Sequence, residues 1–139
     1  MKRLLVDTNV ALDVLLDRLP HPEASVAIWA AAEMGRCEGF LAAHSITTIH
    51  YLAQKELGAA KAKQLVSLLL VVFRVAAVDG SVIEQALQLP MADFEDAVTV
   101  AAALGSGCEF IVTRDPKGFR GSPVRAMGVR AVLAILGEG

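Results

Sequence analysis

Short apolar runs alternate along the chain with longer segments in which apolar residues recur at helical spacing. The short runs have the length of buried strands, whereas apolar positions three and four residues apart are typical of one face of a helix. The predicted strands are residues 4–6, 39–43, 73–78, 109–113 and 124–127, and the predicted helices are residues 10–17, 22–36, 45–57, 59–70, 81–89, 93–104 and 129–136.

Polar residues at the starts of three predicted helices have side chains that cap helices. Ser45, Ser81 and Asp93 are each expected to accept a hydrogen bond from a backbone N–H of the following first turn. Gly58 is expected to end one helix because glycine readily takes the backbone conformation of a C-terminal cap. Pro90 is expected to end another because proline cannot continue a helix.

The alternation of strands and helices predicts an α/β fold in which helices cover a parallel sheet, within a single domain of residues 1–139. No two predicted strands are joined by a two-residue hairpin turn, which agrees with parallel pairing. In such a sheet the strands end at one shared edge, and ligands bind there, where the strand order reverses. Candidate site residues are therefore expected at the strand ends.

Three aspartates are predicted to lie at this edge. Asp7 follows the first strand, Asp115 follows the fourth, and Asp96 lies in the first turn of the helix that leads into the fourth. If the first and fourth strands are neighbours, the three carboxylates meet. Each aspartate alone has an ordinary role as a helix cap or turn residue, so the interpretation depends on all three. Asp79 also ends a strand, but a turn role is expected for it.

Grouped carboxylates repel one another, so at neutral pH either one of them takes up a proton or a cation neutralises them. Oxygen ligands favour Mg²⁺ or Mn²⁺. Zinc is not expected, because the histidines are scattered and neither cysteine joins them; these residues are His21, His44, His50, Cys37 and Cys108. A hydrated Mg²⁺ ion can activate water and bind a phosphodiester oxygen, so phosphate-ester hydrolysis is the predicted reaction class.

The composition and the apolar runs predict how the protein meets other chains and where it is located. Hydrophobic residues make up 55% of the 139 residues and the mean hydropathy is +0.52, so part of the apolar surface is expected to be covered by another chain. The longest apolar run, residues 68–73, falls far short of the ~20 residues that span a bilayer. The first residues lack the apolar segment of a secretory signal, which predicts a cytoplasmic protein with reduced cysteines.

Charge is distributed unevenly, although the net charge is only -2. Residues 1–113 contain eight basic and thirteen acidic residues, whereas the segment from Arg114 onward contains five basic and two acidic residues. Arg114, Lys117 and Arg120 could therefore bind the phosphates of a nucleic acid beside an acidic site. The alternative is a solvated basic loop.

Four motifs occur in a characteristic order. They are LVDTNV at residues 5–10, SITTIHYL at residues 45–52, DFEDA at residues 93–97, and VTRD at residues 112–115 followed by Gly118 and Phe119. Together they resemble the PIN domain family of Mg²⁺-dependent ribonucleases, and the resemblance covers essentially the whole chain. It is closest to bacterial members of the VapC-like toxin type.

The resemblance implies a three-layer α/β/α fold with a five-stranded parallel sheet in the order 3-2-1-4-5, in which Asp7 and Asp115 lie side by side. It implies an endoribonuclease in which Asp7, Asp96 and Asp115 hold Mg²⁺ or Mn²⁺ and in which cleavage of RNA leaves a 5′-phosphate. It also implies a homodimer and a small antitoxin protein that blocks the site, so that this chain would be the toxin of the pair.

One position departs from the family pattern. PIN nucleases usually supply a glutamate from the third helix, and His50 stands at the matching place in this chain. Asp13, or Asp93 on the same helix face as Asp96, could replace the missing carboxylate. The simpler interpretations are a solvated surface charge for Asp13, a helix N-cap for Asp93 and a hydrogen-bonded helix residue for His50.

Asn9 and Thr113 are candidate supporting residues, because their side chains can hold Asp7, Asp115 or a metal-bound water by hydrogen bonds. The alternative roles are a helix N-cap for Asn9 and a β-forming residue at a strand end for Thr113. Trp29 is expected to pack in a core or an interface rather than against a nucleic-acid base.

Three functions follow from these observations, in descending order. The first is a metal-dependent endoribonuclease, and the second is a PIN-like module that binds RNA or protein without catalysis, which the histidine at position 50 suggests. The third is a phosphatase of the haloacid-dehalogenase type, which also begins with an aspartate after a strand. Such phosphatases need a second aspartate two residues later, where this chain has Asn9, so this function ranks last.

Overall fold

A computed structural model describes residues 1–18 and 23–137 of the chain. Its elements in chain order are β1 (Arg3–Val6), α1 (Thr8–Leu15), α2 (Glu23–Glu33), β2 (Glu38–Ala42), α3 (Ala43–Leu57), α4 (Ala59–Val72), β3 (Arg74–Ala76), α5 (Gly80–Gln88), α6 (Phe94–Gly105), β4 (Phe110–Val112), the 3₁₀ helix η1 (Pro116–Phe119), β5 (Arg125–Met127) and α7 (Val129–Leu136). Each predicted strand and helix is present, whereas η1 was not predicted. The predicted helix start at Pro22 lies outside the described residues.

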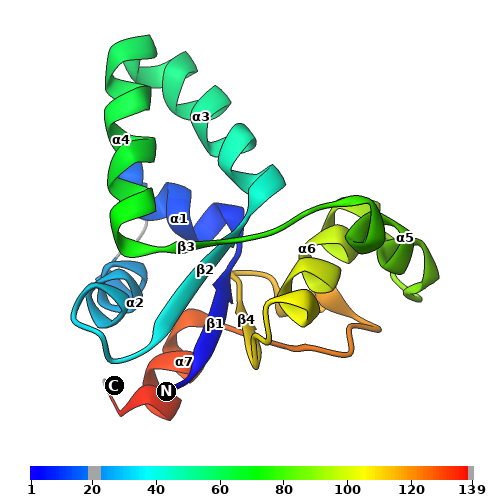
Figure 1. Cartoon of the computed structure of the whole chain (residues 1–139). Helices are drawn as coiled ribbons and strands as arrows, with labels where there is room; N and C mark the ends of the chain where they lie inside the picture. The colour runs from blue at the N-terminus through cyan, green and yellow to red at the C-terminus, as the bar shows by residue number, and fades with distance from the viewer. Residues whose placement is uncertain (19–22, 138–139) are drawn as a thin grey trace.

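The five strands form one parallel sheet in the order β3-β2-β1-β4-β5, which confirms the predicted fold class and strand order. Strand residues alternate between its two faces, as the strand period of two requires. In β1, Leu5 packs into the core beneath α5 and α6, whereas Leu4 and Val6 pack into the core beneath α1, α2 and α7. The sheet is therefore the middle of three layers, and Figure 1 shows the helices on either side of it.

Two of the three predicted helix caps are wrong. Ser45 is buried inside α3, because the helix begins at Ala43 directly after β2 without a side-chain cap. Asp79, rather than Ser81, caps α5 by accepting a 3.0 Å hydrogen bond from the backbone N–H of Val82. That bond lowers the pKa of Asp79 below its usual value. The predicted cap at the start of α6 and the glycine end of α3 are confirmed.

Helices α3 and α4 form an antiparallel pair that projects beyond the sheet (Figure 1). Exposed large apolar residues gather on this pair and on the adjacent edge strand, and they are Tyr51, Leu57, Leu68, Leu70, Val71 and Val75. Val71 is 83% exposed, and such a surface is typical of a region that another chain covers. Across the described residues, no helix combines the length and the apolar character needed to cross a membrane.

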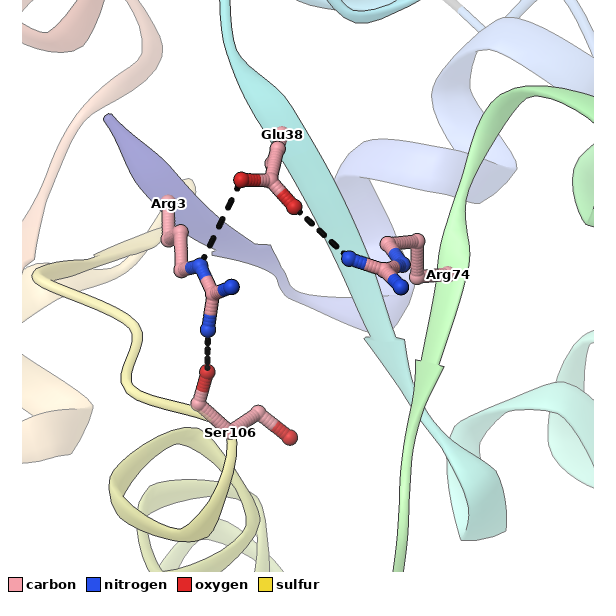
Figure 2. A network of polar contacts seen from close by, with 4 residues as sticks. All are labelled: Arg3, Glu38, Arg74 and Ser106. Atoms are coloured by element: carbon pink, nitrogen blue, oxygen red, sulfur yellow. Dashed lines mark hydrogen bonds and ion pairs between the residues drawn. The ribbon is translucent and has the colours of Figure 1, made fainter. Parts of the chain in front are cut away.

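The amino-terminal edge of the sheet is held by a polar network (Figure 2). Glu38 on β2 accepts hydrogen bonds from Arg3 on β1 at 3.4 Å and from Arg74 on β3 at 2.8 Å. The bond from Arg74 is the main reason that the pKa of Glu38 is lowered. Arg3 also donates to the carbonyl of Ser106 at the C-terminal end of α6, which favours a cation. The network therefore joins three strands and a helix at the edge opposite the strand ends.

Two glycines allow close packing between elements. Gly121 has a φ of +86°, and a Cβ there would lie 2.5 Å from the carbonyl oxygen of Pro90, so the loop after η1 packs directly on the loop between α5 and α6. Gly39 in β2 lies under the ring of Phe73, and a Cβ there would lie 2.6 Å from a ring carbon. The same ring meets Trp29 edge to face at 5.1 Å, which confirms that Trp29 packs in a core.

The contact beneath Phe73 predicts a cost for a small enlargement of β2. Gly39→Ala should lower the free energy of unfolding by about 1–3 kcal/mol, because the buried ring has to move. Gly80→Ala is the matched control, since a Cβ at Gly80 meets nothing within 4 Å and this residue lies in a helix. Urea unfolding followed by circular dichroism measures both. Equal stability of the two variants would contradict the packing described here.

Candidate active site

The ends of the two central strands lie next to each other. Strands β1 and β4 pair in parallel with Val6 opposite Val112, so the residues that follow, Asp7 and Thr113, are neighbours at the carboxyl edge of the sheet. The backbone N–H of Asp7 donates to the carbonyl of Val112 at 2.9 Å. The N–H of Thr113 donates to the carbonyl of Met127 on β5 at 3.0 Å. These backbone hydrogen bonds between neighbouring strands thus fix where the side chains of Asp7 and Thr113 begin.

The hydroxyl group of Thr113 links two of the candidate aspartates. It donates to Oδ2 of Asp7 at 2.9 Å and accepts from the backbone N–H of Asp115 at 3.1 Å. Thr113 is only 1% exposed, so its hydroxyl depends on these two partners. One buried side chain therefore sets both the orientation of the Asp7 carboxylate and the path of the chain into Asp115.

Asp7 is also the N-cap of α1, since its Oδ1 accepts from the backbone N–H of Thr8 at 2.9 Å. Asn9, for which an N-cap was the alternative role, is instead an exposed residue inside this helix. Burial raises the pKa of Asp7 above its usual value, although the hydrogen bonds from Thr113 and Thr8 lower it. The carboxylate is therefore held in place while its charge is only partly compensated.

Asp96 and Asp115 approach the same point in space. Asp96 lies in the first turn of α6, where its N–H donates to the capping carboxylate of Asp93 at 3.0 Å. Asp115 precedes η1, and its carbonyl accepts from the N–H of Gly118 at 3.1 Å. A Cβ on Gly118 would lie 3.0 Å from Oδ2 of Asp115 and 3.8 Å from Oδ2 of Asp96. The absence of a side chain at Gly118 therefore lets its backbone lie close to both carboxylates.

Negative charge accumulates around Asp96. Burial, followed by the charges of Asp93, Asp7, Glu95 and Asp115, raises the pKa of Asp96 to about 6. The charged neighbours that raise the pKa of Asp96 are all acidic, and Arg114 offsets only part of the charge of Asp7. A bound cation would remove the repulsion, which agrees with the chemistry expected of grouped carboxylates.

The side chains suit a hard, oxygen-preferring divalent ion in donor type and in charge. Among residues 1–18 and 23–137, however, no three histidine, cysteine or acidic side chains are close enough as they stand to hold one ion. Mg²⁺ retains several waters and needs few direct carboxylates, so Asp96 and Asp115, whose Oδ2 atoms both lie near Gly118, would hold a hydrated ion. Asp7 would then contact the ion or one of its waters.

The basic residues near the site differ in their surroundings. Arg114, Lys117 in η1 and Arg120 after it are all exposed, and Nε of Arg114 lies 3.2 Å from Oδ2 of Asp13. Asp13 is only 6% exposed, so the expectation that it is a solvated surface charge is wrong. Burial costs a carboxylate stability unless it is paired, and the guanidinium group of Arg114 provides the partner.

Two histidines lie on α3 with different contacts. His50, at the position of the expected glutamate, is half-buried. His44, the second residue of α3, was not singled out for the site, although its Nε2 lies 3.3 Å from the hydroxyl of Thr99 on α6. That hydroxyl donates to the carbonyl of Glu95, so His44 is the donor and its buried Nδ1 is left without a partner. The position of His44 directly after the second strand, at the carboxyl edge of the sheet, could have marked it as a candidate from the sequence.

Comparison with known proteins decides the family. The family described as "PIN domain" matches residues 3–117, which is most of the chain. The chain belongs to the PIN domain family. No curated protein is similar enough in sequence to match it.

Several solved structures share the fold at low sequence identity. VapBC2 from Rickettsia felis, bound to a promoter DNA fragment, is 12% identical with a TM-score of 0.72, covering 91% of this chain and 98% of that one. VapC20 from Mycobacterium tuberculosis, a sarcin–ricin loop cleaving toxin, is 18% identical with a TM-score of 0.62, covering 78% and 86%. A toxin–antitoxin complex from Klebsiella pneumoniae is 17% identical with a TM-score of 0.68, covering 91% and 97%.

The raised pKa of Asp96 predicts a pH-dependent gain in stability when its charge is removed. The folded pKa of about 6 exceeds the usual 3.8, so the ionised carboxylate destabilises the folded PIN domain above pH 6. Asp96→Asn should therefore stabilise the metal-free protein by about 1 kcal/mol at pH 8, after allowance for solvent screening. The gain should disappear toward pH 4, where wild-type Asp96 is protonated in the folded state.

Urea unfolding in EDTA at pH 8 and near pH 4 measures this difference. A gain that is the same at both pH values would point to a cause other than the carboxylate charge. Asp17→Asn serves as the control, because Asp17 is an exposed carboxylate after α1 and asparagine also tolerates its φ of 47°.

The bridging hydroxyl of Thr113 predicts a second stability difference. Thr113→Val keeps the shape of the side chain but leaves the Asp7 oxygen and the Asp115 N–H without their partner. We expect the free energy of unfolding at neutral pH to fall by about 1–3 kcal/mol. Thr113→Ser retains the hydroxyl and should lie closer to the wild type. If valine and serine behave alike in denaturant titrations, the hydroxyl is not the stabilising group.

Proposed function

We propose that this PIN domain is a Mg²⁺- or Mn²⁺-dependent endoribonuclease that hydrolyses RNA phosphodiester bonds. Asp7, Asp96 and Asp115 are its catalytic and metal-binding residues. The observation that supports the proposal is the negative charge that gathers around Asp96, whose carboxylate lies with that of Asp115 close to Gly118. Such a charge cluster at the strand ends of an α/β sheet favours a cation and suits phosphoryl chemistry.

When bound, the ion would supply an activated water and polarise the phosphodiester. The protein's own contribution is to hold the ligands and the strand. Thr113 keeps one oxygen of Asp7 oriented, and the N–H of Thr8 holds the other. Asn9 is exposed in the first turn of α1, from which it could contact a metal-bound water. Asp93 orients the start of α6 and adds to the negative charge at Asp96.

Basic residues beside the carboxylates would bind the substrate. Lys117 and Arg120 are exposed in and after η1, which follows Asp115. Their charges can neutralise RNA phosphates, so binding should weaken as salt rises. Arg114 lies between Thr113 and Asp115 in the chain, and its charge lowers the pKa of Asp7. Its ion pair with Asp13 holds the guanidinium group near the site.

A toxin role with an antitoxin partner is the corresponding biological proposal. Two of the similar structures are a VapBC complex and a toxin–antitoxin complex. The exposed apolar residues of α3, α4 and β3 offer a surface for a partner protein, and those of α5 and the start of α6 offer one for a second copy in a homodimer; the latter are Ile83, Leu87 and Phe94. A protein of this kind would act in the cytoplasm.

The alternative is a PIN module that binds RNA or a protein without cleaving it. His50 favours this alternative, because it removes a carboxylate from the expected ligand set. Such a module would retain RNA in Mg²⁺ or Mn²⁺ and release no product.

A cleavage assay on mixed RNA separates the two functions. In Mn²⁺ the wild type should produce fragments with 5′-phosphate ends, and EDTA should stop the reaction. Asp7→Asn should reduce cleavage by about 100-fold or more, because the amide is a weaker ligand for a hard cation. Sequencing of the fragment ends would show both the activity and its preference.

Asp17→Asn is the matched control for this assay, since it makes the same chemical change on an exposed residue just after α1. It should cleave like the wild type. Full activity of Asp7→Asn would exclude the proposed site, and RNA binding without any product in either metal would leave the binding module as the function.

A further inference from the structure

A pocket of about 510 Å³ lies beside the carboxylates, between α1, α2 and α7. It is lined by Asp13 of α1, the first turn of α2, Thr113 and Arg114 after β4, and the start of α7 from Gly128 to Ala131. Thr113 is the residue that holds Asp7, so the pocket and the carboxylate site share one wall. Its volume falls within the range of sites for small ligands, which is ~300–1,000 Å³.

The start of α7 favours an anion in this pocket. Backbone N–H groups of a helix's first turn lack partners within the helix, and the N-cap residue Gly128 has no side chain to accept from them. The first turn of α2 also lines the pocket. Arg114 and Arg130 add two guanidinium groups, so the walls carry more positive than negative charge.

Asp13, the acidic residue among the described residues that line the pocket, indicates what else a ligand must supply. Asp13 is 6% exposed, and only its Oδ2 is paired, with Nε of Arg114 at 3.2 Å. Its Oδ1 is buried and has no hydrogen-bond partner. An unpaired buried carboxylate oxygen is costly, which favours an occupant that brings an O–H or N–H donor. The pocket therefore suits a ligand with an anionic group and a donor close together.

We propose that this pocket binds one ribonucleotide unit of the RNA strand next to the scissile phosphodiester. The phosphate lies against the start of α7 and Arg130, and a ribose hydroxyl donates to the carboxylate of Asp13 once that side chain turns its buried oxygen toward the pocket. A ribonucleotide carries both groups, whereas a deoxyribonucleotide within a strand lacks the 2′-hydroxyl. The inference rests on the proposed ribonuclease function, because it places the strand relative to Asp7 and Asp115.

Binding without cleavage tests the proposal directly. The Asp7→Asn protein in EDTA is titrated with a ribose trinucleotide, the deoxyribose trinucleotide of the same sequence, and inorganic phosphate, while backbone amide signals are followed by NMR. The ribose trinucleotide should shift the amide signals of Val129, Arg130 and Ala131 and should bind several-fold more tightly than the deoxyribose one. Inorganic phosphate should shift the same signals more weakly.

Arg130→Ala should weaken ribose trinucleotide binding about fivefold to tenfold and reduce the slope of log affinity against log salt by about one. Arg125→Ala is the matched control, because Arg125 is an exposed arginine on β5 that is absent from the pocket lining. Equal weakening by both substitutions, or none by Arg130→Ala, would overturn the proposal. Equal binding of the ribose and deoxyribose strands, or of phosphate and the ribose strand, would leave only an anion site and would also overturn it.

Failure of this inference can be told apart from failure of the proposed function. If the wild type cleaves RNA in Mn²⁺ but the amides of α7 do not respond, the pocket is excluded and the ribonuclease stands. If the wild type yields no product in either metal, the ribonuclease itself fails, and with it the placement of the strand.

Discussion

The repulsion among carboxylates at the ends of β1 and β4 is the constraint on which the rest of the site depends. Parallel pairing places Asp7 beside Thr113, and the start of α6 adds Asp96 from the other side of the sheet. The fold compensates for this crowding only locally, through the Thr113 hydroxyl and the helix N–H groups. The remaining charge gives the edge its preference for a cation, so the same feature that costs stability provides the chemistry.

Much of this arrangement could be predicted from the sequence because it follows from chain order. The end of a parallel strand has to lie at the ligand-binding edge, which was enough to bring Asp7, Asp96 and Asp115 into one hypothesis. The environment of Asp13 could not be predicted in the same way. Its partner Arg114 is distant in the sequence, and its burial depends on how α1 packs against α2 and α3. The start of α3 was mispredicted because β2 runs directly into this helix at Ala43, and no side chain caps it that the sequence could have marked.

The site combines a central group of carboxylates with basic side chains next to them. Asp96 and Asp115 lie close to Gly118, while Arg114, Lys117 and Arg120 come from the same short segment that carries Asp115. A nucleic-acid strand needs both kinds of charge, since cations attract its backbone and the carboxylates would recruit the metal that acts on it. The pairing of Arg114 with Asp13 holds this guanidinium group near Asp7, whose pKa its charge lowers.

The contact between Gly121 and Pro90 has a consequence for how this site can vary. It ties the loop that precedes Asp93 and Asp96 to the loop that follows Asp115, backbone against backbone, with no room for a side chain at residue 121. The segments that carry Asp96 and Asp115 are consequently held together at this contact. Lengthening either loop would change the distance between these two carboxylates.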